Sequence, residues 1–115
     1  MQTSYTTAYN KFSKMNPYLL KDILEATPQQ LVIRLYDLAI VSCKKHDLRK
    51  TNSALQALIN GLSFENQSVS EISTGLLRLY KFCQDQMRDG NYDIVTGVLS
   101  ELRETWVQAF NNNNE

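Results

Sequence analysis

Cysteine, proline, glycine and histidine are all scarce in this chain of 115 residues, which holds two Cys, two Pro, four Gly and one His. Two thiols cannot form the disulfide framework of a small secreted domain, and one histidine leaves no set of ring nitrogens for a zinc site. The glycines are isolated from one another, so the sequence contains no glycine-rich phosphate loop. We therefore expect no cofactor and no metal site, and a protein that is not an enzyme.

An excess of one charge sign is also missing, because 12 Lys+Arg balance 12 Asp+Glu. Nucleic-acid binders and proteins held on anionic membranes usually carry a basic surplus, so both partner classes are disfavoured. No stretch approaches the roughly 18 apolar residues of a membrane span, and the first residues contain no apolar signal segment. The sequence thus predicts a cytoplasmic protein with no nucleic-acid and no membrane partner.

Polar stretches and caps divide the chain into an arm, one domain and a tail. Residues 1–15 are polar apart from a few aromatic side chains, and we expect them to form a flexible N-terminal arm. Asn16 followed by Pro17 is typical of a helix start and predicts a short N-terminal helix. We assign residues 16–110 to a single helical-bundle domain and the Asn-rich residues 111–115 to a disordered tail.

Four longer helices are expected within that domain, at about 28–43, 50–64, 68–88 and 93–110. Ser68 and Glu71 form a candidate capping box for the third of them, and Gly90 suits the left-handed residue that ends it. Apolar residues recur at three- and four-residue spacing, without the strict alternation of strands. The predicted fold is all-α: an antiparallel up-and-down four-helix bundle with a short N-terminal helix and a flexible N-terminal arm.

The first of these long helices is more apolar than one buried face requires. Residues 31–43 read LVIRLYDLAIVSC, in which Arg34, Asp37 and Ser42 are the polar residues. Such a helix is either central to its domain or keeps one face for a partner. Core residues and groove residues share the same spacing, so the sequence leaves both assignments open.

Three of the predicted helices carry a set of short motifs. Residues 26–40 contain an Ala-Thr-Pro cap before Leu-Tyr-Asp, residues 71–82 contain Glu-Ile and Leu-Tyr, and residues 93–106 contain Leu-Arg and end in Trp. In this order and spacing they resemble the FliS family of flagellar secretion chaperones, and the resemblance covers about 26–110.

This resemblance implies an export chaperone in the bacterial cytosol that binds the disordered C-terminal segment of flagellin. It would prevent premature polymerisation and keep flagellin competent for flagellar type III secretion, with components of the export apparatus as further partners. We expect a monomer or weak dimer. The family motifs and the apolar surplus together suggest a flagellin-binding groove made of Leu31, Ile33, Leu35, Tyr36, Ile40, Leu79, Tyr80 and Trp106. Tyr9 and Tyr18 are the candidates for contacts made by the arm.

Two alternatives remain open. The apolar surplus on residues 31–43 would also suit a self-associating helical bundle without a flagellin client. Histidine phosphotransfer domains are four-helix bundles of similar size, which makes His46 a candidate phosphate acceptor. Its position at a predicted helix end, directly before the carboxylate of Asp47, disfavours this role because the carboxylate would repel a phosphate.

Overall fold

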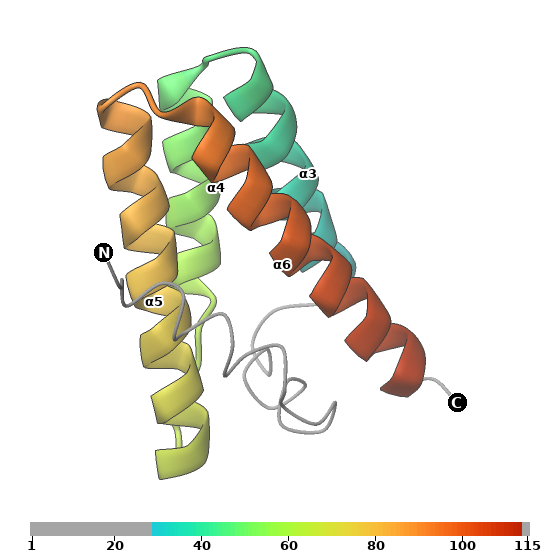
Figure 1. The fold of residues 1–115 in the computed structure, drawn as a ribbon. Helices are drawn as coiled ribbons and strands as arrows, with labels where there is room; N and C mark the ends of the chain where they lie inside the picture. Colours follow the sequence, from blue (N-terminus) through green and yellow to red (C-terminus); the bar gives the residue numbers. More distant parts are fainter. Residues whose placement is uncertain (1–28, 114–115) are drawn as a thin grey trace.

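A computed structural model describes residues 29–113, which form four helices joined by short connections (Figure 1). The helices are α3 (Gln29–Lys44), α4 (Leu48–Asn60), α5 (Gln67–Arg88) and α6 (Tyr92–Asn113). Each runs antiparallel to the next. α3 packs against α4 and α6, and α5 packs against the same two helices on the other side of the bundle. The predicted all-α, antiparallel up-and-down four-helix bundle is confirmed, while the expected arm and short helix lie outside the described residues.

The core consists of apolar side chains that recur every three or four residues, so that each helix turns one stripe inward. Fully burying a large aliphatic or aromatic side chain contributes about 1.5–3 kcal/mol, which is why this stripe dictates the helix packing. Its largest members are fully enclosed: Val32, Tyr36, Leu55, Leu76, Leu79, Tyr80, Met87, Leu99, Leu102 and Trp106.

Two tight turns close the same end of the bundle, and each passes through one residue with a positive φ. Gly90 has φ +80° in the α5–α6 turn, which confirms its predicted left-handed conformation. His46 takes the equivalent place in the α3–α4 turn, with φ 59°. In the α3–α4 turn the Asp47 amide donates to the Ser42 carbonyl at 2.9 Å, and in the α5–α6 turn the Asn91 amide donates to the Gln86 carbonyl at 2.9 Å. Both bonds span five residues, as in a Schellman motif.

Two predicted helix starts differ from the structure, and in each case the N-cap is a side chain that the prediction did not name. The carboxylate of Asp47 accepts a hydrogen bond from the Lys50 amide at 3.1 Å, so α4 begins at Leu48. The side chain of Asn66 accepts from the Val69 amide at 3.0 Å, so α5 begins before the expected Ser68 cap. Asn and Asp are strong N-caps, and here they determine where the helices start.

Two helix ends also differ from expectation. α4 stops at Asn60 instead of continuing to residue 64, because Gly61 serves as its C-cap. α6 continues to Asn113, past the expected end at residue 110. The buried side chains of Ala109 and Phe110 anchor those last turns in the core, which offsets the weak helix propensity of the asparagines.

Candidate functional site

A buried chain of hydrogen bonds connects three of the residues that the sequence placed in a groove. The indole Nε1–H of Trp106 on α6 donates to the hydroxyl of Tyr36 on α3 at 2.8 Å. That hydroxyl lies 2.6 Å from the hydroxyl of Tyr80 on α5. The three side chains are enclosed by the bundle, as is Leu79. The structure therefore places these four residues in the core, and their contact with a client remains a prediction.

The hydroxyls of this chain are unsuited to acid–base chemistry. Burial raises the pKa of Tyr36 well above its ordinary value, and it does the same for Tyr80. Both phenols stay protonated over the physiological range and act as hydrogen-bonding groups between helices. Their role is to fix α3, α5 and α6 relative to one another.

The outward side of α3 exposes three large apolar side chains to solvent, together with the charged side chain of Arg34. Leu31, Leu38 and Val41 are 45%, 47% and 50% exposed, and their spacing of seven and three residues puts them on one face of the helix. We call these three residues the α3 outer face. Leu31 was predicted as a groove residue, whereas Leu38 and Val41 were missed. Helical spacing from Leu31 would have found both.

The other predicted groove residues on α3 lie outside this face. Ile33 and Ile40 are half-buried on the side toward α6, where Asp37 between them pairs with Arg103 at 2.6 Å. Leu35 is half-buried on the side toward α4. Of the predicted groove residues, Leu31 belongs to the α3 outer face and Leu35 lies next to it, whereas Ile33 and Ile40 lie on another side of α3.

A small apolar hollow separates α3 from α4 near Leu35. Its volume of about 10 Å³ is roughly that of one water-sized probe, so it can take no more than a small group. Leu35 and Tyr80, both predicted groove residues, meet there. The hollow is lined by Val32, Leu35, Ala57, Leu58, Gly61, Leu62 and Tyr80.

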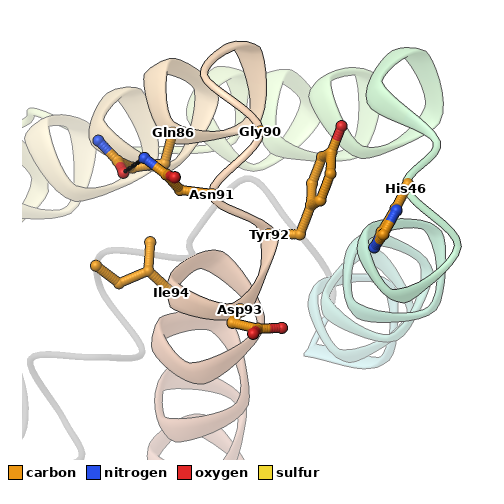
Figure 2. Close-up of a pocket in the computed structure, with 7 residues that line it drawn as sticks. All are labelled: His46, Gln86, Gly90, Asn91, Tyr92, Asp93 and Ile94. Carbon is orange, nitrogen blue, oxygen red and sulfur yellow. Dashed lines mark hydrogen bonds between the residues drawn. The ribbon is translucent and has the colours of Figure 1, made fainter.

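A second, wider hollow of about 570 Å³ lies at the end of the bundle where the two tight turns meet (Figure 2). The ring of His46 stacks on that of Tyr92, with centroids 4.1 Å apart and planes 18° from parallel. On the far side of Tyr92, Asn91 donates to Gln86 at 2.8 Å, and the carboxylate of Asp93 also faces the hollow. This carboxylate, like that of Asp47, would repel a phosphate, so the geometry adds no support for phosphotransfer by His46.

Cys43 and Cys83 are free and buried, as expected of thiols in an apolar helix stripe. The Cys43 thiol donates to Met87 Sδ at 3.5 Å and accepts from the Thr96 hydroxyl at 3.3 Å. Within residues 29–113, no group of three or more His, Cys, Asp or Glu side chains is placed to hold a metal ion. No helix in the described part of the chain is long and apolar enough to cross a membrane.

Comparison with protein families identifies the family of this chain. No curated protein and no solved structure matches the sequence. A family model described as flagellar protein FliS matches residues 9–113. The matched region includes all four described helices, as well as Tyr9 and Tyr18, which lie outside the described residues. Because the match extends over most of the sequence, the chain belongs to the FliS family of flagellar proteins.

Proposed function

We propose that this protein is a cytoplasmic export chaperone for flagellin, which binds the disordered C-terminal segment of flagellin. Binding prevents premature polymerisation and keeps flagellin competent for flagellar type III secretion. Membership of the FliS family supports a flagellar export chaperone role in general, since this is a family of chaperones and not of enzymes. The structural observation that carries the proposal is the α3 outer face.

The α3 outer face suits a partner that folds into a helix as it binds. From Leu31 to Val41 the face extends about 15 Å along α3, which is nearly three helical turns. An amphipathic helix binds such a surface through its own apolar side chains. Covering the exposed half of each side chain contributes roughly 1 kcal/mol, and this gain offsets part of the cost of ordering the client.

The core residues have an indirect part in this proposal. Tyr36, Leu79, Tyr80 and Trp106 hold α3 in place, so that the outer face is presented on a rigid support. We further propose that Tyr9 and Tyr18 contact the bundle or the client, because aromatic side chains in a polar arm gain most by docking on an apolar surface. Components of the export apparatus complete the proposed set of partners, and the proposed state of the free protein is a monomer or weak dimer.

The proposal is tested by titrating the C-terminal segment of flagellin into the full chain and measuring binding by calorimetry. Leu38→Glu places a charge in the α3 outer face and should weaken binding at least about tenfold, which corresponds to about 1.4 kcal/mol. Ile94→Glu is the matched control, since Ile94 is similarly exposed at 40% but lies on α6. It should bind like the wild type, and both variants should keep the wild-type melting temperature.

Two results would contradict the proposal. If the wild-type chain leaves the flagellin segment unbound, the segment is not its client. Sedimentation then decides whether the alternative of a self-associating bundle holds. A concentration-independent dimer that Leu38→Glu converts to a monomer would show that the α3 outer face binds a second copy of this chain.

A further inference from the structure

Carboxamide side chains form a row on the outside of α4, next to α5. Asn52, Gln56 and Asn60 recur every four residues along α4, and Gln84 reaches them from α5. Gln84 Nε2 donates to Gln56 Oε1 at 3.3 Å, and Gln56 Nε2 donates to Asn60 Oδ1 at 3.1 Å. We call these four residues the carboxamide row.

Asn52 is the unpaired member of the row. Its Oδ1 is enclosed, yet it accepts no hydrogen bond from the described chain. A buried acceptor without a donor costs free energy, so a rotation of the amide that brings this oxygen to the surface, where it can accept a hydrogen bond, lowers that cost. A half-turn about the last side-chain bond exchanges the oxygen with the amide nitrogen, so either end of the group can face outward.

The row borders a shallow hollow of about 620 Å³ between α4 and α5. The hollow contains no carboxylate, and its one charged group is Arg49. Leu48, which is 39% exposed, lies at one end of it. The lining is Leu48, Arg49, Asn52, Ser53, Gln56 and Gln84.

The spacing of the row matches an extended polypeptide. Residues four apart on a helix are separated by about 6 Å along its axis. Every second residue of an extended chain advances by about 6.2–6.8 Å. A carboxamide also presents a donor and an acceptor side by side, as a peptide group does. Successive members of the row can therefore pair with alternate peptide groups of an extended segment.

We propose that the carboxamide row binds an extended stretch of the client through its main chain, with an apolar client side chain resting on Leu48. This inference rests on the proposed function, because it gives the row the same client as the α3 outer face. A second folded copy of this chain is a poor occupant, since residues 29–113 are almost entirely helical and their main-chain groups are already paired. A disordered client has free peptide groups along its length.

Two experiments with the full chain test this inference. First, the double variant Asn52→Ala, Gln56→Ala should weaken binding of the C-terminal flagellin segment by about tenfold without lowering the melting temperature. Gln108→Ala is the control, because Gln108 is an exposed carboxamide on α6, outside the row. Second, N-methylation of single peptide bonds in the flagellin segment should weaken binding over one short stretch in which Ala substitutions have little effect.

The outcomes separate this inference from the function on which it depends. If the wild type and the double variant bind flagellin equally, the carboxamide row has no part in recognition, although the chaperone function stands. Sensitivity to Ala substitution but not to N-methylation throughout the segment would likewise overturn main-chain recognition. If the wild-type chain does not bind flagellin at all, the proposed function and this inference both fail.

Discussion

The indole N–H of Trp106 donates a 2.8 Å hydrogen bond to the hydroxyl of Tyr36, which lies 70 residues earlier in the sequence. The same hydroxyl oxygen lies 2.6 Å from that of Tyr80, so one atom connects α3, α5 and α6. All three side chains are buried in a largely apolar core, where a polar group without a partner is costly. Tyr36 is therefore the centre of this network.

Tyr36→Phe should destabilise the bundle more than Tyr80→Phe. The first change removes a buried hydroxyl that hydrogen-bonds to both Trp106 and Tyr80, at a cost of about 2 kcal/mol. The second leaves the bond between Trp106 and Tyr36 intact and should cost about 1 kcal/mol. Urea unfolding followed by far-UV circular dichroism measures both. Equal losses would contradict the central role of Tyr36.

Stability should fall steeply at alkaline pH. Burial raises the pKa of Cys83 from 9.0 to about 12, and it raises the pKa of Tyr36 and Tyr80 above 10.0. Below about pH 8 these groups are protonated in both states, so their contribution is constant. Above it the unfolded chain releases protons that the folded chain retains. The free energy of unfolding then falls, by up to about 4 kcal/mol per pH unit once all three groups titrate in the unfolded chain.

This prediction is checked by urea unfolding at a series of pH values from about 8 to 11. Cys83→Ala is the informative variant, because it removes the group with the lowest unfolded pKa. Its stability should stay constant to about pH 9 before it begins to fall. A wild-type stability that does not change over this range would show that the three groups are not buried in the folded protein.

The helix pattern was predictable from the sequence because amphipathic spacing determines which stripe is buried. The exact helix ends were less predictable, because Asn66 and Ser68 are both good N-caps and the packing of the chain selects between them. Gly90 was predictable from its missing side chain. The left-handed conformation of His46 was not predictable, because this conformation is unfavourable for residues other than glycine. Its stacking on Tyr92 is visible only in the structure.

The candidate site was harder to predict, for a different physical reason. Tyr36, Tyr80 and Trp106 carry the family motifs, yet the structure places them inside the bundle. Leu38 and Val41 belong to no motif and lie outside. Apolar residues at helical spacing serve a core and a groove equally well, so the sequence cannot separate them. What separates them is the position of the neighbouring helices, which depends on contacts such as that between Tyr36 and Trp106.

His46→Gly and His46→Ala should have different effects on stability. Both remove the stacked contact with Tyr92, which contributes about 0.5–1.5 kcal/mol. Gly also relieves the strain of a left-handed backbone, whereas Ala retains it. We therefore expect His46→Gly to unfold near the wild-type temperature and His46→Ala to be about 1 kcal/mol less stable than His46→Gly. Thermal unfolding of the pair tests this, and identical stabilities would argue against a positive φ at this position.

The ion pair between Asp37 and Arg103 should make a small contribution that depends on salt. Asp37 belongs to the Leu-Tyr-Asp motif, but its side chain is 52% exposed and that of Arg103 is 35% exposed. Exposed pairs of this kind contribute about 0.2–1 kcal/mol, and salt screens them. A double-mutant cycle of Asp37→Asn and Arg103→Gln should therefore give a coupling below about 1 kcal/mol that declines toward zero at about 1 M salt. A coupling above about 2 kcal/mol, unchanged by salt, would mean that the pair is shielded from solvent and holds α3 against α6 far more firmly than its exposure indicates.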